Sequence, residues 1–323
     1  MAIQSLTSLL SEELRELDAY LATKSQTKVN MINELSSHII SSGGKRLRPI
    51  VLLLSAYSSD SKLKKHVLDA CVVVEFIHAA TLLHDDVVDM SKIRHSKETA
   101  NIIWGNKGSV LVGDFLYSRA FEIIVQLDNA GVYETLANTT NIIAQGEVMQ
   151  LMNIGNVELS EDMYMDIIFR KTAILFQASA KIGGIINGAS KKNIEALSTY
   201  GLHFGRAYQL RNDYLDYFGD SKSTGKNIIE DLLEGKATLP IIHAMSKSND
   251  EDRIEIKEAF SKADPKVELG IIKILKKYKS DLYIQNKIKE QTEFAIKALE
   301  NLRPSKYKNE LIQLANYCQD RPR

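Results

Sequence analysis

Two clusters of acidic residues stand inside apolar stretches of this sequence, and both have the spacing of a single helix face. In the first cluster, Asp85 and Asp89 are four residues apart, with Asp86 beside them. Residues at this spacing stack on one face of an α-helix, so the two carboxylates point the same way. In a partly dry setting such like charges repel each other unless a cation neutralises them. The cluster therefore predicts either a site for a hard cation such as Mg²⁺ or an exposed acidic helix end.

The second cluster favours the metal site over the exposed helix end. Asn212 and Asp216 repeat the four-residue spacing, Asp213 lies beside them, and the flanking residues are again mostly apolar. Two such helices facing each other would line a cavity with carboxylates. Mg²⁺ typically keeps several waters and shares its coordination with substrate phosphates. The predicted metal ligands are Asp85, Asp86, Asp89, Asn212, Asp213 and Asp216.

Basic residues at loop positions supply positive charge that metal ions alone would not provide. Carboxylates, metals and these cations together describe a site for a polyphosphate. Taken singly, each basic residue is more often an ordinary solvated charge. The residues concerned are Lys45, Arg46, Arg48, Arg94, Arg170, Lys171, Lys226 and Lys236.

Two other kinds of site are disfavoured by their patterns. The segment that ends in Gly225-Lys226 is not a P-loop, because Asn227 stands where Ser or Thr would ligate Mg²⁺ and no strand precedes it. Glu75 and His78 form one Glu-x-x-His element, whereas di-iron bundles use this element in pairs. His78 is therefore either a polar site residue or an ordinary core histidine.

The composition excludes several classes of partner. The chain of 323 residues carries 41 Lys and Arg against 41 Asp and Glu, so its formal net charge is zero and any anion site must be local. Cys71 and Cys318 lack metal or disulfide spacing, which predicts two buried or incidental thiols in a reducing compartment. No apolar run approaches the ~20 residues of a membrane span, and no basic leader precedes an apolar core. We expect a cytoplasmic protein without a transmembrane segment or a nucleic-acid partner.

Apolar residues recur at helical spacing almost everywhere, and this periodicity predicts an all-α fold. The prolines fall at helix starts or in connections. Ser160, followed by two acidic residues, is a candidate N-cap. The breaks in periodicity, the two longest of them over 91–106 and 219–235, do not resemble interdomain linkers. We therefore expect one helical domain over residues 1–323, with about ten or more helices.

Five motifs in the same order and register carry a family resemblance. They are Gly43 to Pro49, Asp85 to Asp89, Lys171 to Ala173, Gln209 to Asp216, and Gly225-Lys226 followed by Asp231-Leu232 and Gly235 to Pro240. Together they resemble the trans-type polyprenyl diphosphate synthases across most of the chain. The stretches 82–89, 110–115 and 146–153 look most like the octaprenyl-producing bacterial members. The resemblance implies a single-domain isoprenoid synthase-type helical bundle around a central active-site cavity.

The resemblance also implies a Mg²⁺-dependent prenyltransferase. An allylic diphosphate such as farnesyl diphosphate would ionise as Mg²⁺ draws off its diphosphate, with three ions expected when substrate is bound. The carbocation would alkylate isopentenyl diphosphate, the released diphosphate would take a proton, and the product would re-enter as the next allylic substrate. Metals and cations stabilise such a leaving group, and aligned substrates gain proximity. A homodimer and a role in isoprenoid biosynthesis, with ubiquinone as the expected end use, are implied as well.

Residue by residue, the motifs carry the family's roles onto this chain. Asp85, Asp89 and Asp213 would be catalytic, with Asp86, Asn212 and Asp216 completing the metal set. The allylic diphosphate would be held by Arg94, Lys171, Lys226 and Lys236. Isopentenyl diphosphate would be held by Lys45, Arg48 and His78, and by His95. The carbocation or the reacting ends would be steadied by Thr172 and Gln209, with Lys171 among the catalytic residues.

The chain departs from the family pattern at two positions. His95 stands where a second arginine is usual, which provides a shorter and pH-sensitive cation. Asn212 opens the second acidic motif in place of Asp, which keeps an oxygen ligand but removes a formal charge. We expect weaker binding of one metal ion rather than loss of activity.

Small residues before the first acidic motif bear on the product length. In this family the growing chain runs down between helices, and residues one turn before the motif form the upper floor. Here Ala80 and Thr81 occupy that turn and Ile77 lies below them, so the channel stays open past short products. Ile124 and Leu136 are candidates for the deeper stop, although an ordinary core role is favoured for both. The expected product is medium to long, octaprenyl diphosphate by likeness.

Three alternatives remain open. A shorter-chain farnesyl or geranylgeranyl synthase would use the same motifs. A terpene cyclase would share the fold, but it binds one diphosphate and would not need Lys45 and Arg48. A non-catalytic subunit of a heteromeric synthase is suggested by His95 and Asn212 but opposed by the retained aspartates.

Overall fold

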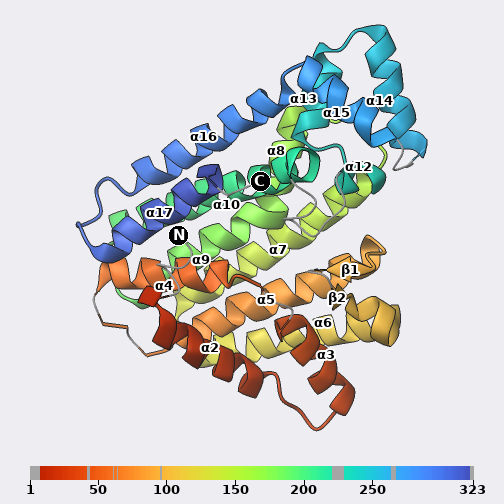
Figure 1. Cartoon of the computed structure of the whole chain (residues 1–323). Coiled ribbons are helices and arrows are strands. Elements are labelled where there is room, and N and C mark those ends of the chain that lie inside the picture. Colours follow the sequence, from red (N-terminus) through yellow and green to blue (C-terminus); the bar gives the residue numbers. More distant parts are fainter. Residues whose placement is uncertain are drawn as a thin grey trace. The chain divides into compact units, whose positions relative to one another are not determined.

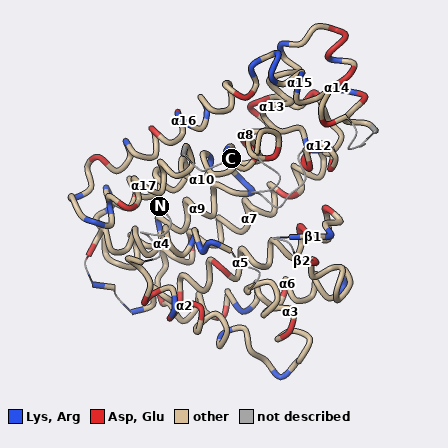
Figure 2. The backbone as a smooth tube through the Cα atoms, in the orientation of Figure 1, with Lys and Arg blue, Asp and Glu red and all other residues tan. Residues whose placement is uncertain are grey.

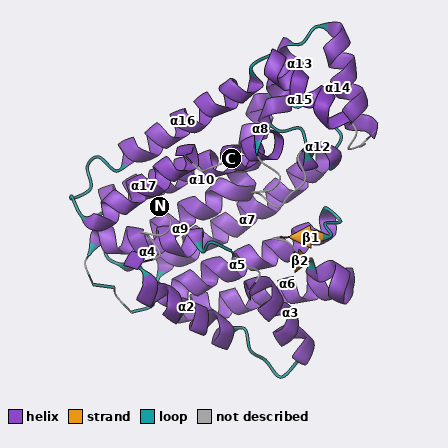
Figure 3. Cartoon of the chain, in the orientation of Figure 1, coloured by secondary structure: helices purple, strands orange, loops and turns teal. Residues whose placement is uncertain are grey.

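The computed structural model describes residues 8–41, 44–60, 62–63, 65–94, 97–219, 229–262 and 267–320, and most of them are helical (Figure 3). The helices are α2 (Ser11–Lys24), α3 (Asn30–Ser41), α4 (Leu47–Ser59), α5 (Val67–Val88), α6 (Ala100–Gln126), α7 (Ala130–Met152), α8 (Glu161–Ile168), α9 (Ile174–Ile186), α10 (Lys191–Phe218), α12 (Glu230–Leu233), α13 (Leu239–Lys247), α14 (Asp250–Lys262), α15 (Glu268–Lys277), α16 (Ser280–Ala298) and α17 (Lys306–Asp320). A π-helical turn, η1 (Phe169–Ala173), lies between α8 and α9. The all-α prediction is confirmed.

The β-structure among the described residues is one short antiparallel hairpin. Its strands are β1 (Ile93–Arg94) and β2 (Lys97–Glu98). The break predicted over 91–106 is wrong in its second half, because α6 already begins at Ala100. Gly105 lies inside α6 with a φ of 77°, a left-handed conformation that glycine adopts without a steric penalty. A helix with a kink therefore stands where the sequence pattern indicated a loop.

The chain divides into two compact units, each built from three stretches of sequence. Unit 1 consists of Met1–Thr140, Ala178–Ser198 and Asn301–Leu311. Unit 2 consists of Asn141–Gln177, Thr199–Glu300 and Ile312–Arg323. The first acidic cluster belongs to unit 1 and the second to unit 2.

Unit 1 has α5 as its central helix, which contacts α2, α3, α4 and α6. Figure 1 shows α5 and α6 side by side. The residues from Val67 to Leu83 are apolar on nearly all sides, as expected of a helix surrounded by others. Close approach of α6 depends on Gly113, because a Cβ atom there would lie 2.3 Å from Nε2 of His84. Cys71 is a free, buried thiol of this core, as predicted.

Within the described residues, α5 alone has the length and the apolar character that a membrane-crossing helix requires. In the structure 67% of its most apolar window is buried. The core helix of a soluble protein meets the same criterion, so this helix is weak evidence for a membrane span.

Unit 2 has a core formed by α8, α10 and the helices from α12 to α16. Tyr214 and Tyr217 of α10 are buried in this core. The N-cap prediction at Ser160 is confirmed, because its hydroxyl accepts a hydrogen bond of 3.2 Å from the backbone N–H of Met163. Figure 2 shows residues of both charge signs on α14 and α15.

Candidate active site

The first acidic cluster lies at the carboxyl end of α5, and its three carboxylates have different environments. Asp85 and Asp89 are partly exposed, whereas Asp86 is only 1% exposed. Both Nε and Nη2 of Arg94 donate to Oδ1 of Asp86, at 3.0 and 2.7 Å. Burial raises the pKa of Asp86, and the hydrogen bond from Arg94 opposes this rise. Asp86 is therefore engaged within the protein, while the other two carboxylates remain accessible.

A small set of hydrogen bonds fixes the hairpin that carries Arg94. The carbonyl of Ser91 accepts from Oγ1 of Thr99 at 2.6 Å and from Nδ2 of Asn101 at 3.1 Å. The backbone N–H of Thr99 donates to the carbonyl of Lys92 at 3.1 Å. These contacts position the guanidinium over the first cluster. His95 lies outside the described residues.

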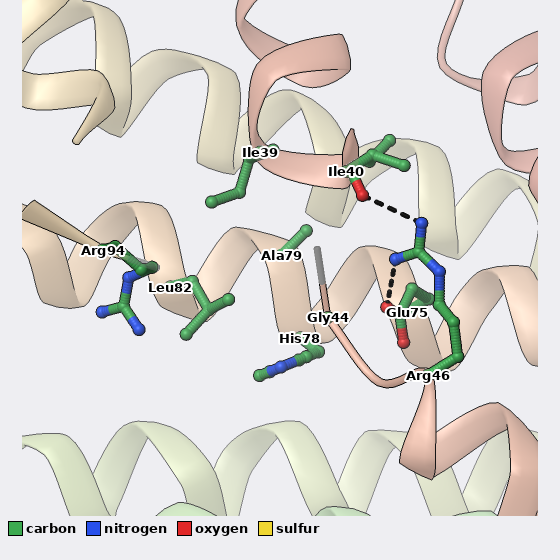
Figure 4. Close-up of a pocket in the computed structure, with 9 residues that line it drawn as sticks. All are labelled: Ile39, Ile40, Gly44, Arg46, Glu75, His78, Ala79, Leu82 and Arg94. Carbon is green, nitrogen blue, oxygen red and sulfur yellow. Dashed lines mark hydrogen bonds and ion pairs between the residues drawn. The ribbon is translucent and has the colours of Figure 1, made fainter. Parts of the chain in front are cut away.

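A pocket in unit 1 contains one residue predicted to hold isopentenyl diphosphate, His78, and one predicted to hold the allylic diphosphate, Arg94. His78 and Arg94 are both in its lining, and Figure 4 shows them with Leu82 between them. Lys45 and Arg48 lie on either side of Arg46, which also lines the pocket. The full lining is Ile39, Ile40, Gly44, Arg46, Glu75, His78, Ala79, Leu82 and Arg94.

Arg46 belongs to the basic residues of the predicted polyphosphate site, but the family resemblance assigns it no substrate. Its backbone is left-handed, with a φ of 49°. Its Nη1 contacts Oε1 of Glu75 at 2.6 Å, and its Nη2 donates to the carbonyl of Ile40 at 2.9 Å (Figure 4). Burial lowers the pKa of Arg46, but Glu75 and Asp18 more than offset this, so the pKa is raised. Glu75 inside an apolar helix was the available signal, since a buried charge requires a partner.

The predicted chain-length residues occupy the α5 core of unit 1. Ile77 and Ala80 are buried, and Thr81 is partly exposed with its hydroxyl donating to the carbonyl of His78 at 2.8 Å. Ile124 and Leu136 are buried as well. Burial suits both a channel wall and an ordinary core, so their role in product length stays a prediction.

The second acidic cluster, in unit 2, is organised around a buried aspartate. Asp213 is 2% exposed, and its Oδ2 accepts a hydrogen bond from the hydroxyl of Tyr164. Its Oδ1 accepts from Nε2 of Gln209 at 2.7 Å. The Oε1 of Gln209 in turn accepts from the hydroxyl of Thr172 at 3.0 Å. Burial raises the pKa of Tyr164 well above its usual value, so the phenol is a donor at neutral pH.

The π-helical turn η1 contains Lys171 and Thr172, which were predicted to contact the allylic substrate. A π-helical turn inserts one extra residue per turn and recurs at functional sites. The turn packs tightly, because a Cβ on Gly205 would lie 2.6 Å from Cα of Ala173. Nζ of Lys171 contacts Oε2 of Glu147 on α7 at 2.6 Å. Glu147 lies in the stretch 146–153, which carries part of the family resemblance, but no role was predicted for its carboxylate.

Asp216 and Lys236 have local partners in unit 2. The carboxylate of Asp216 accepts from the backbone N–H groups of Glu230 and Asp231, each at 3.2 Å, at the start of α12. Nζ of Lys236 contacts Oε2 of Glu234 at 2.7 Å. Asn212 is partly exposed. Lys226 lies outside the described residues.

The accessible carboxylates fit a metal that takes only part of its coordination from protein. Among the described residues, no three His, Cys, Asp or Glu side chains form a complete metal cage. Mg²⁺ does not require one, since it usually binds one or two carboxylates together with waters and substrate phosphates. Asp85 and Asp89 offer such a pair on one helix face. Asp86 adds a buried Oδ2 atom without a hydrogen-bond partner.

Comparison with known proteins gives one consistent result. Residues 29–276 match the family model described as polyprenyl synthetase. The octaprenyl diphosphate synthase of Haemophilus influenzae is 39% identical over 322 residues, which cover 99% of this chain and 98% of that protein. The octaprenyl diphosphate synthase of Escherichia coli is 38% identical over 324 residues and matches over the full length of both chains.

Solved structures agree with the sequence matches. A polyprenyl synthase from Caulobacter crescentus, crystallised with calcium and isoprenyl diphosphate, superposes with a TM-score of 0.94 and 35% identity over 99% of this chain and 98% of its own. A decaprenyl diphosphate synthase from Rhodobacter capsulatus gives 0.93 and 36% over 99% of both chains. A divalent cation is therefore compatible with this architecture.

Proposed function

Because this chain belongs to the polyprenyl synthetase family, we propose that it adds isopentenyl diphosphate units successively to an allylic diphosphate such as farnesyl diphosphate. It is a prenyltransferase, a medium- to long-chain trans-polyprenyl diphosphate synthase. The observation that carries the proposal is full-length similarity at 38–39% identity to two octaprenyl diphosphate synthases. That similarity supports a product of eight isoprene units.

Asp85 and Asp89 would hold Mg²⁺ in this proposal. When bound, Mg²⁺ would neutralise the charge that develops on the departing diphosphate. The accessibility of these carboxylates supports this role, and three ions with substrate bound remain the expected number. Asp86 would act by holding Arg94, whose remaining N–H groups would meet the allylic diphosphate.

The remaining cations would hold the two diphosphates. Lys45, Arg48 and His78 would bind isopentenyl diphosphate, and Arg46 supports this assignment because its ion pair with Glu75 anchors the segment between Lys45 and Arg48. The allylic diphosphate would be bound by Arg94, Lys171, Lys226 and Lys236, and His95 would complete the isopentenyl diphosphate site. Lys171 and Lys236 are held by Glu147 and Glu234 and would exchange these partners for phosphate oxygens.

Thr172 and Gln209 would face the reacting carbons. Thr172 donates its hydroxyl proton to Gln209, so the lone pairs of its oxygen are the part left for a cationic carbon. Asp213, buried beneath Gln209, would contribute to the metal site through its charge. Asn212 and Asp216 would complete that site.

Chain length would be set along α5. Ala80 and Thr81 present small side chains on one turn, and Ile77 lies one turn further from the acidic cluster. The α-carbon rise of about 5.4 Å per turn means that each blocked turn shortens the product by roughly one isoprene unit. Thr81 is the informative position because it is partly exposed and accepts a larger side chain without overpacking the core.

The protein would be a cytoplasmic homodimer made of one domain over residues 1–323. A set of exposed apolar side chains on α6 supports self-association, since exposed apolar surface can mark an interface. It comprises Val110, Leu111, Phe121 and Val125. The division of each unit into three stretches of chain supports a single domain. Cys71 and Cys318 are buried and form no disulfide, which suits a reducing compartment.

Incubation of the purified protein with Mg²⁺, farnesyl diphosphate and labelled isopentenyl diphosphate tests the proposal. We expect a ladder of dephosphorylated products that ends near eight isoprene units. Products that end at geranylgeranyl would identify a short-chain enzyme, and no elongation would point to a non-catalytic subunit.

A second arm tests the floor on α5. Thr81→Phe should shift the end of the ladder to shorter products, whereas Thr81→Ser should leave it in place. A ladder of unchanged length in Thr81→Phe would remove this residue from the channel.

A further inference from the structure

A chain of hydrogen-bonded side chains in unit 2 begins at Tyr164, a residue that lies outside the sequence motifs and has no predicted role. The chain runs from Tyr164 on α8 to Asp213, from there to Gln209, and ends at Thr172 in η1. The side chains of this hydrogen-bonded chain come from three elements, α8, α10 and η1. Tyr164 lies five residues before η1 begins and is 3% exposed.

The direction of every hydrogen bond in this chain follows from its buried aspartate. An ionised carboxylate only accepts, so the groups that face Asp213 must be donors. Gln209 can therefore present only its amide Nε2 to Asp213, which leaves its Oε1 directed at Thr172. An amide oxygen only accepts, so Thr172 must donate its hydroxyl proton to it. The orientation of the Thr172 hydroxyl is thus determined by Asp213, which is two hydrogen bonds away from it.

Tyr164 is the second donor that keeps Asp213 in this geometry. Its hydroxyl contacts Oδ2, and Gln209 contacts Oδ1, so the carboxylate is held from both sides. Loss of one donor would allow the buried carboxylate to rotate toward other donors, because a buried acceptor that loses its hydrogen bond is unfavourable. Gln209 and Thr172 would follow that rotation.

We propose that Tyr164 is a positioning residue which, through Asp213 and Gln209, directs the lone pairs of the Thr172 hydroxyl toward the reacting carbons. The proposal rests on the proposed function in one respect, namely that Thr172 faces the allylic cation. Tyr164 itself touches no substrate.

A double-mutant cycle in kcat tests the connection between Tyr164 and Thr172. Tyr164→Phe removes one oxygen and keeps the ring, and Thr172→Val removes the hydroxyl and keeps the shape. We expect Tyr164→Phe alone to lower kcat about tenfold while KM for both diphosphates changes by less than about twofold. In the Thr172→Val background, the same change should lower kcat less than about twofold, because the hydroxyl it orients is gone.

Thr172→Ser provides the conservative background. Serine keeps the hydroxyl, so Tyr164→Phe should again lower kcat about tenfold there. An equal loss in the Val and Ser backgrounds would overturn the proposal, since the tyrosine would then act independently of the hydroxyl.

Tyr217→Phe is the matched control for general stability. Tyr217 is also a buried tyrosine of the unit 2 core, and its hydroxyl accepts from Thr238 at 3.3 Å rather than contacting Asp213. Thermal unfolding should show similar losses for both variants, with kcat retained in Tyr217→Phe. If kcat falls as much in Tyr217→Phe as in Tyr164→Phe, a general loss of stability explains both results. That outcome would overturn the proposal.

Hydrogen exchange separates this inference from the proposed function. The peptide over residues 169–177 should exchange faster in Tyr164→Phe than in Tyr217→Phe, because η1 loses the support of the chain. This result is independent of turnover. If the wild-type protein fails to elongate but the exchange difference appears, the proposed function is wrong and the positioning contact stands. If elongation occurs and neither the kinetic coupling nor the exchange difference appears, the positioning role is wrong.

Discussion

The two acidic clusters have the same spacing in sequence but hold their buried carboxylate in different ways. In unit 1, Asp86 is neutralised by a cation, because Arg94 donates two hydrogen bonds to one of its oxygens. In unit 2, two neutral donors among the described residues contact Asp213, namely the hydroxyl of Tyr164 and the amide of Gln209. The first arrangement fixes a hairpin, and the second fixes the orientation of two further side chains.

This difference shows that an acidic motif is not a uniform set of metal ligands. In each cluster, one carboxylate is buried and bonded to a distant side chain, whereas the others are partly exposed. Asp85 and Asp89 are accessible, whereas Asp216 accepts the N–H groups that open α12. Substitutions within one motif should therefore have distinct signatures in activity and in stability.

The largest expected effect is on an accessible carboxylate. Asp89→Ala should lower kcat about 10²–10³-fold, because charge on the departing diphosphate loses its metal-mediated stabilisation. The free energy of unfolding should stay within about 0.5 kcal/mol of wild type, since this side chain is partly solvated. Steady-state kinetics and urea unfolding measure the two quantities. Glu122→Ala, at an exposed acidic residue on α6, is the control and should change neither.

Asp86→Ala should show the opposite balance in the first cluster. It leaves the guanidinium of Arg94 without its partner and should lower the free energy of unfolding by about 2 kcal/mol. Water can partly replace the carboxylate, because the Arg94 side chain is 30% exposed. Asp86→Ala combined with Arg94→Met should be less destabilised than Asp86→Ala alone.

Tyr164→Phe should lower the free energy of unfolding by only about 1 kcal/mol in the second cluster, since it removes a donor to Asp213 that is neutral. Equal losses in the two clusters would contradict the distinction between ionic and neutral support.

Asn212→Asp would make the second cluster resemble the first in charge. One further negative charge at a partly exposed position should lower the Mg²⁺ concentration for half-maximal activity by about three- to tenfold. Titration of activity with Mg²⁺ at fixed substrate measures the change. Asn286→Asp adds the same charge to an exposed position of α16 and should have no effect. An unchanged Mg²⁺ requirement in Asn212→Asp would place residue 212 outside the metal site.

The smallest expected effect is that of metal removal on stability. Asp86 and Asp213 are supported by protein donors, so the fold does not need a metal to balance its buried carboxylates. EDTA should therefore abolish turnover while shifting the melting temperature by less than about 2 °C. Mg²⁺ added together with farnesyl diphosphate should raise the melting temperature, since both bind the folded state. A large loss of stability with EDTA alone would show that the carboxylates depend on the ion.

Much of the fold followed from local patterns. Helical periodicity predicted the all-α class. Ser160 was predicted as an N-cap because two acidic residues follow it, and its hydroxyl does accept from the backbone N–H of Met163. The break predicted over residues 91–106 failed in part. Turn-forming residues there also suit a hairpin, and a kinked helix tolerates Gly105.

The partners of the site residues could not be read in the same way. Tyr164 and Asp213 are 49 residues apart, and Arg46 and Glu75 are 29 apart. Spacing identifies residues on one helix face, but it carries no information about which helix packs against that face. A buried Glu75 predicts a cationic partner, but the sequence does not indicate which residue that partner is.

The residue types and their intervals along the chain determined the helical fold, the family and the identity of the charged groups available for diphosphate chemistry. These properties depend on local periodicity and on motifs that lie within a few turns of helix. Tertiary packing decided which carboxylate of each cluster is buried, which donor it receives, and how Thr172 is oriented. Burial and hydrogen-bond direction arise only when distant helices exclude water from the same place, and no interval along the sequence encodes that contact.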